Sequence, residues 1–179
     1  MFLVSACSLL WFAAAGENNV ESYQDKVVTL PPLPPLSTNE QFYEPTVRLH
    51  HSGVLAMLAG AVKQAEDMEQ PQVVVVVDAS GEVLGEIRMT GSKFLSRKSA
   101  LAKARTAASI NNSSHNVPAH VASELSAATQ GAITSLMGGL PVRVEGILVG
   151  GVGVGSGHGF QDLVVAQAAL AAAGADRVE

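Results

Sequence analysis

The sequence contains a single cysteine, Cys7, among its 179 residues. One thiol cannot close a disulfide within the chain, and it cannot build a metal site made of several cysteines. Basic residues are scarce as well, because 11 Lys and Arg stand against 16 Asp and Glu and leave a net charge of −5. No nucleic-acid partner is expected, since affinity for phosphates requires a basic surface.

Aromatic side chains make up only 4% of the sequence, whereas hydrophobic residues of all kinds make up 47%. The core is therefore expected to consist of Val, Ala and Leu. A chain of this length has room for one domain of ordinary size and a tail, with enough apolar residues to build a core.

The first 48 residues differ in composition from the rest. Residues 2–16 form an apolar run of signal-peptide length that ends in small residues, although no Lys or Arg precedes it. A secretory signal, an extra helix and a wrongly assigned start are the alternatives, and the run is short for a stable membrane span. Residues 17–48 are polar and proline-rich, which favours an extended arm or spacer. The protein is expected to be secreted if residues 1–16 are a signal peptide, and cytoplasmic otherwise.

The domain is placed at residues 49–179, where the pattern alternates between helices and strands. Five consecutive valines, Val73 to Val77, predict a strand covered on both faces, and residues 83–89 return from it across a turn that ends in Gly81. The globular domain is expected to start near Thr46. A first helix is predicted from the recurrence of apolar residues that begins at Leu49, and Pro71 closes it; further helices are predicted over residues 93–112, 118–128 and 160–173. This order is typical of an α+β fold around an antiparallel sheet.

The stretch from Gly138 to Asp162 is the most distinctive part of the sequence. Its first four residues, Gly-Gly-Leu-Pro, predict a turn; apolar β-type residues follow, then glycine at nearly every second position, and then a helix start. We expect backbone amides in this loop to bind an anionic group such as a carboxylate or propionate. The residues concerned are Gly155, Ser156, Gly157 and Gly159. The alternative is that the glycines only permit tight packing between strand and helix or between subunits.

Two titratable residues accompany this loop. Asp162 is expected in the first helical turn, where the helix dipole stabilises a negative charge, and His158 precedes it by four residues. Together they could act as an acid–base pair, or His158 could be an axial ligand of haem iron. The remaining histidines, His50, His51, His115 and His120, do not match a zinc helix signature.

Six of the 11 basic residues fall between Arg88 and Arg105. At helical spacing these charges spread around the axis, so a solvated face or salt bridges between subunits is the ordinary interpretation. Arg88 differs, because it ends a strand that faces the glycine turn at Gly91. Among the basic residues, we therefore expect Arg88, in preference to those on the helix, to contribute to ligand binding.

Several of these strings resemble the GlcG/HbpS haem-binding family. They are residues 76–84, residues 88–92, the helix with Lys103-Ala104, Gly138-Gly139-Leu140-Pro141, and residues 150–157 followed by Gln161-Asp162. The resemblance implies a five-stranded antiparallel sheet flanked by helices and assembly into homo-oligomers. Members of the family include a haem-binding and haem-degrading partner of a sensor protein, and a domain fused to cobalamin-processing enzymes. Thr90 stands where the family commonly has an aspartate.

Three functions stay open from the sequence. The first is binding of haem, a related tetrapyrrole or another anionic small molecule, with slow haem breakdown as a further option. The second is a cofactor-independent isomerase, cyclase or lyase that acts on a carboxylate or enol and moves a proton through Asp162 or His158. The third is an assembly protein whose glycine-rich strand is an oligomer seam.

Overall fold

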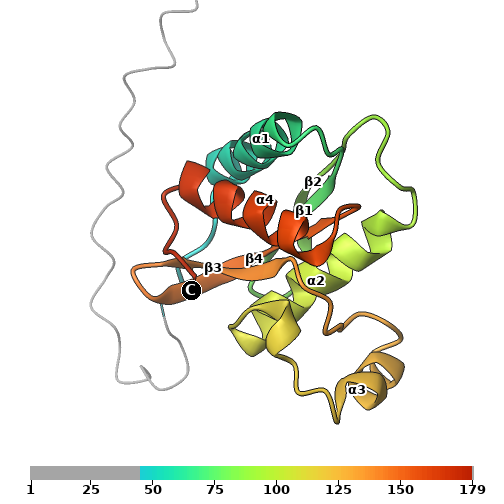
Figure 1. The fold of residues 1–179 in the computed structure, drawn as a ribbon. Coiled ribbons are helices and arrows are strands. Elements are labelled where there is room, and N and C mark those ends of the chain that lie inside the picture. Colours follow the sequence, from blue (N-terminus) through green and yellow to red (C-terminus); the bar gives the residue numbers. More distant parts are fainter. Residues whose placement is uncertain (1–44, 179) are drawn as a thin grey trace, which may run out of the picture. The chain divides into compact units, whose positions relative to one another are not determined.

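A computed structural model describes residues 45–178 of the chain (Figure 1). The predicted signal peptide and most of the proline-rich arm therefore lie outside the described residues. The elements follow in this order: α1 (His51–Asp67), β1 (Val73–Asp78), β2 (Val83–Arg88), α2 (Ser96–Ile110), a 3-10 turn η3 (Ser114–Asn116), α3 (Ala122–Ala128), β3 (Gly139–Val144), β4 (Ile147–Gly155) and α4 (Gly159–Ala172).

The strands form one antiparallel sheet in the order β2-β1-β4-β3. The predicted α+β class is confirmed. Within the described residues the sheet has four strands, one fewer than the family resemblance implies. No helix in this part of the chain is long and apolar enough to cross a bilayer.

Helices cover both faces of the sheet, as the valine run predicts. In β1 the side chains alternate, so Val74 and Val76 join a cluster with α1 and α4, while Val73, Val75 and Val77 pack on alanines of α2. In Figure 1, α1 and α4 run next to each other over one face, and α2 lies against the other. Because β1 is buried on both faces, every position in its apolar run has a packing role.

The glycines of β4 allow helix α2 to pack closely against the backbone of the strand. A Cβ at Gly151 would lie 2.3 Å from the carbonyl oxygen of Ala104, and one at Gly153 would lie 2.0 Å from that of Ala100. Gly155 is packed less tightly, since its Cβ would lie 3.0 Å from the carbonyl oxygen of Ser96. The packing interpretation of this glycine pattern is therefore confirmed for the strand itself, and it fixes how α2 crosses the end of β4.

Some predicted boundaries are wrong. The Gly-Gly-Leu-Pro turn ends at Gly138 (φ 111°), and Gly139 already opens strand β3. Pro141 is tolerated there because β3 is an edge strand that need not donate a ladder hydrogen bond at this residue. The turn before β4 is instead formed by Glu145 and Gly146, whose φ angles of 52° and 80° match a two-residue hairpin loop.

The helix predicted over residues 118–128 is also shorter than expected. Its first turn lies at Ala122, and the preceding segment holds the separate 3-10 turn. Helix α2 is shortened at both ends of the predicted 93–112 range, and Asn111 ends it in the left-handed conformation (φ 50°).

Candidate functional site

A pocket of about 280 Å³ lies where helices α2 and α4 begin. Three segments far apart in the sequence line it: the start of α2, the approach to β3, and the loop between β4 and α4. The lining residues are Lys93, Leu95, Ser96, Ser99, Lys103, Leu136, Met137, Ser156, Gly157, Gly159 and Asp162. Four of them, Ser156, Gly157, Gly159 and Asp162, belong to the loop and helix start singled out from the sequence.

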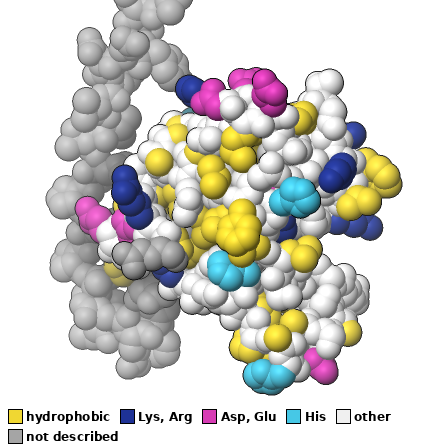
Figure 2. Space-filling view, viewed as in Figure 1, with side chains coloured by type: hydrophobic (Ala, Val, Ile, Leu, Met, Phe, Trp, Pro, Cys, Tyr) yellow, Lys and Arg dark blue, Asp and Glu magenta, His cyan; other side chains and the backbone are white. Residues whose placement is uncertain are grey.

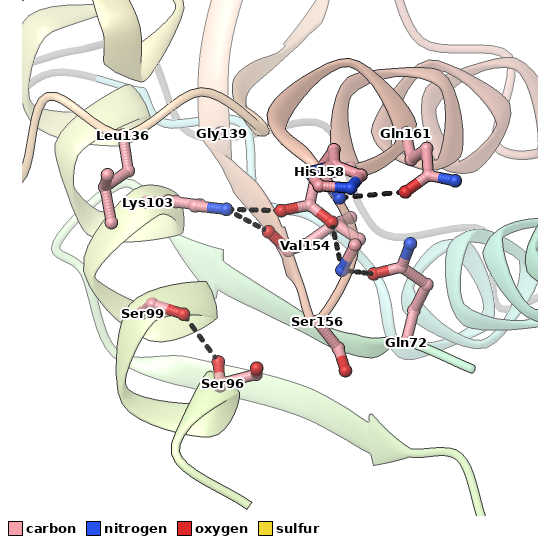
Figure 3. Close-up of polar contacts among 12 residues, drawn as sticks. Gln72, Ser96, Ser99, Lys103, Leu136, Gly139, Val154, Ser156, His158 and Gln161 are labelled. Atoms are coloured by element: carbon pink, nitrogen blue, oxygen red, sulfur yellow. Dashed lines mark hydrogen bonds and ion pairs between the residues drawn. The ribbon is translucent and has the colours of Figure 1, made fainter. Parts of the chain in front are cut away.

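A buried ion pair joins the two helices at this pocket. Lys103 Nζ of α2 lies 2.6 Å from Asp162 Oδ2 of α4, and the two side chains are only 5% and 3% exposed. The same ammonium donates to the carbonyl oxygen of Val154 at 2.8 Å (Figure 3). A buried charge is tolerated only with close partners of this kind. Lys103 is thus not part of a solvated face, and that prediction is wrong for this residue.

The rest of the basic segment lies toward solvent, apart from the half-buried Arg105. Arg97 forms a surface ion pair with Glu86, at 2.5 Å between Nε and Oε1. The hydrogen bond and the charge of Glu86 raise the pKa of Arg97 further above its usual value. Arg105 is half-buried and donates to the carbonyl oxygen of Gly81 at 2.9 Å.

The amide of Gly157 binds a carboxylate of the protein itself, that of Asp162. This N–H donates to Asp162 Oδ1 at 2.9 Å and to Gln72 Oε1 at 3.2 Å. Both carboxylate oxygens of Asp162 are therefore engaged, one by the loop and one by Lys103. The expectation of an amide waiting for an external anion is corrected at Gly157: Asp162 fills that position and fixes the loop.

Ser156 carries a strained backbone at the pocket wall. Its φ of 102° is rare for a residue with a side chain. Its hydroxyl accepts a hydrogen bond from the backbone N–H of Lys93 at 2.9 Å, and its carbonyl accepts one from Gln70 Nε2 at 3.4 Å. Such strain persists only where the surroundings hold it, and it is concentrated at ligand and active sites.

His158 stands at the edge of the pocket, between the lining residues Gly157 and Gly159, with an exposed side chain. It is the N-cap of α4, and its backbone N–H donates to Gln161 Oε1 at 2.8 Å (Figure 3). Within the described residues its imidazole makes no hydrogen bond to Asp162, which is buried and bonded elsewhere. The structure therefore does not join the two residues as an acid–base pair.

Arg88 lies outside the pocket. It is exposed at the end of β2 and is paired with Val73, which in turn is paired with Gly155 of β4. Strand β1 thus separates Arg88 from the loop. Among residues 45–178 no group of three or more His, Cys, Asp or Glu is placed to hold a metal ion, and His50, His51, His115 and His120 are all exposed.

The model of the family described as "Haem degrading protein HbpS-like" matches residues 49–171. The chain belongs to this HbpS-like family. It is 31% identical over 134 residues to the corrinoid adenosyltransferase PduO of Citrobacter freundii, which covers 72% of this chain and 40% of PduO. The chain therefore spans less than half of that enzyme.

Solved structures of the family have the same fold. The crystal structure of a PduOC:heme complex has a TM-score of 0.68 at 30% identity and covers 74% of this chain and 100% of that one. A double mutant of HbpS from Streptomyces reticuli has a TM-score of 0.66 at 28% identity and covers 79% of this chain and 97% of that one. These matches confirm the family resemblance.

Sequence reasoning missed the α2 side of the pocket. Lys103 is flanked by Ala100 and Ala107 at helical spacing, so a charged residue interrupts an alanine face that packs on the sheet. That interruption was the available signal. Met137 carried no comparable signal, because its place in the pocket depends on how the chain approaches β3.

Proposed function

We propose that this HbpS-like domain binds haem at the pocket between the starts of α2 and α4. The observation that carries the proposal is the position of two phenylalanines. Phe94 and Phe160 are the only Phe, Tyr or Trp residues between positions 45 and 178, and they are 77% and 74% exposed. Phe94 stands between two lining residues, and Phe160 follows the lining residue Gly159. Aromatic rings exposed beside a pocket suit a flat aromatic ligand.

Other side chains at the pocket extend this apolar surface. Leu95 and Leu136 line it and are 62% and 54% exposed. On the face drawn in Figure 2, hydrophobic side chains gather near the middle beside a histidine, while charged side chains lie toward the edges. The pocket volume is just below the usual range for ligand sites, so the pocket would take one edge of the macrocycle, with the phenylalanines against the remainder.

The donors at this end of the pocket fit haem iron. Histidine and methionine are both ligands of haem iron in other proteins, and here Met137 lines the pocket while His158 stands beside it, next to the lining residue Gly159 in the chain. Met137 packs on Gly159, where an added Cβ would lie 3.0 Å from the methionine Cβ and 3.4 Å from its sulfur. In the proposal His158 would hold the iron through an imidazole nitrogen, and Lys93 would hold the acidic side chains of the ring. Bound haem would supply iron redox chemistry, and this chain's residues would hold and orient it.

The first prediction concerns hemin titrated into the purified full chain. We expect a shifted Soret band that saturates at one equivalent per chain. His158→Ala should change the position of the band and weaken binding, because the axial nitrogen is lost. Phe160→Ala should weaken binding about fivefold, because a stacked ring contributes on the order of 1 kcal/mol.

Matched controls come from exposed residues away from the pocket. His120→Ala removes a histidine and Leu55→Ala removes an apolar side chain, and both should bind hemin like the unmodified protein. A hemin spectrum left unchanged by micromolar protein would contradict the proposal. Equal binding by the His158, Phe160 and control variants would contradict the assigned site.

A further inference from the structure

The ammonium of Lys103 has one N–H group that the described residues leave without a partner. A lysine ammonium carries three donors. One donates to Asp162 Oδ2 at 2.6 Å and one to the carbonyl oxygen of Val154 at 2.8 Å. The side chain is 5% exposed, and it lines the pocket. The third N–H is therefore available to an acceptor that enters the pocket.

The pocket has an excess of positive charge. Its titratable lining residues are Lys93, Lys103 and Asp162, and the single carboxylate is already bonded to Lys103 and to the loop. Helix α2 also begins here, at Ser96, with no side-chain cap and no acidic residue in its first turn. The positive end of the helix dipole is thus left without a protein anion, and it acts on the same space as Lys103.

A second unpartnered donor lies next to the pocket wall. The side chain of Gln72 is fully buried, and its Nε2 has no hydrogen-bond partner among the described residues. A Cβ added to the lining residue Gly157 would lie 2.6 Å from this nitrogen. Leaving a buried donor unsatisfied has a cost in stability, and this donor is packed behind Gly157, outside the pocket lining.

We infer that the pocket binds a carboxylate group, with Lys103 as the binding residue and Asp162 as the residue that positions it. A carboxylate has two acceptor oxygens, so one can accept from Lys103 Nζ, while the positive end of the α2 dipole favours the negative charge in the same pocket. The volume of about 280 Å³ suits a small organic acid or the end of a propionate arm. The carboxylate has two sources, a free small acid and the propionate of haem, and only the second source rests on the proposed haem function.

The test uses the haem-free full chain at constant ionic strength. Propionate is titrated against propionamide, a neutral molecule of nearly the same shape, and both are followed by amide NMR and by the melting temperature. We expect saturable shifts at the Gly157 and Gly159 amides with propionate, and none with propionamide. Equal responses to the two compounds, or no response to either, would overturn binding of a free acid.

Two serine variants of α2 locate the site. Ser99→Leu fills the pocket and leaves the ion pair in place, because the Ser99 hydroxyl donates only to the carbonyl oxygen of Ser96 among the described contacts. Ser109→Leu makes the same change at an exposed position near the other end of the helix. Propionate binding should weaken about tenfold or more in the first variant and stay unchanged in the second, since a charge-assisted hydrogen bond is lost. Unchanged binding in Ser99→Leu would contradict the site.

Hemin and its dimethyl ester separate the two sources, because the ester has no free carboxylate. Weaker binding of the ester, together with competition between propionate and hemin, assigns the pocket to a haem propionate. Equal binding of hemin and ester, together with propionate binding, assigns it to a free acid. Propionate binding without any hemin binding would refute the haem proposal and support this one. Equal binding of hemin and ester without propionate binding would refute this one and leave haem binding standing.

Discussion

Replacing Lys103 with methionine is expected to lower the free energy of unfolding by about 3–5 kcal/mol. Methionine keeps an unbranched side chain, one heavy atom shorter, but removes the charge that faces Asp162. The aspartate is 3% exposed and would keep only the Gly157 amide as a close partner. An uncompensated charge in so little solvent is strongly unfavourable. Urea denaturation followed by circular dichroism measures the loss.

The control for this variant lies five residues earlier on the same helix. Lys98 is exposed, so Lys98→Met should change the free energy of unfolding by no more than about 0.5 kcal/mol. The double variant Lys103→Met with Asp162→Leu removes both charges and should recover much of the stability, because no lone charge stays buried. A loss below about 1 kcal/mol in Lys103→Met would show that water reaches the pair and that its burial has been overstated.

The ion pair also explains the loop geometry at the pocket. Asp162 bridges Lys103 of α2 and the Gly157 amide, so one carboxylate fixes the helix and the loop with respect to each other. Ser156 adds a second link, from the end of β4 to the backbone of Lys93. The pocket is thus built between segments that are held by charge-assisted and backbone hydrogen bonds, and such support keeps a binding site in one geometry.

Much of the fold could be predicted because its signals are local. The valine run specified a strand buried on both faces, and the alanine-rich segment specified the helix that packs on it. A turn was wrongly predicted over Gly138–Pro141, because glycine and proline are typical of turns and also occur within edge strands such as β3. What decided the outcome was pairing with β4, which is not a local property.

The candidate site was only half predictable, for the same reason. Gly157, Gly159 and Asp162 are close in sequence, so a glycine loop before a helix was enough to find them. Lys103 is 59 residues from Asp162, and it reaches the pocket only because α2 crosses β4 at close range. The prediction that Arg88 belongs to the site was wrong. Strand pairing puts Arg88 two strands away from Gly155, which is a distance of roughly 10 Å between the two backbones.

Replacing Gly153 with alanine is expected to lower the free energy of unfolding by roughly 3 kcal/mol. The added Cβ would lie 2.0 Å from the carbonyl oxygen of Ala100 and 2.5 Å from the amide nitrogen of Ala104. Both are backbone atoms of α2, so no side-chain rotation can relieve the overlap and the helix must move away from the strand. That movement would also draw Lys103 away from Asp162, so hemin binding should fall together with stability.

Gly53→Ala is the matched control, because it adds the same methyl group to a glycine of α1. The nearest atom there is the end of a flexible side chain, Leu49 Cδ1, at 3.2 Å. Alanine favours a helix over glycine by about 0.5–1 kcal/mol, so this variant should be as stable as the unmodified protein or slightly more stable. Opposite signs for the two substitutions, measured by thermal and urea unfolding, would show that β4 needs glycine for close approach and not for chain flexibility. If Gly153→Ala had the same melting temperature as the unmodified protein, α2 would not pack on the strand backbone. The position of Lys103 in the pocket would then lose its structural basis.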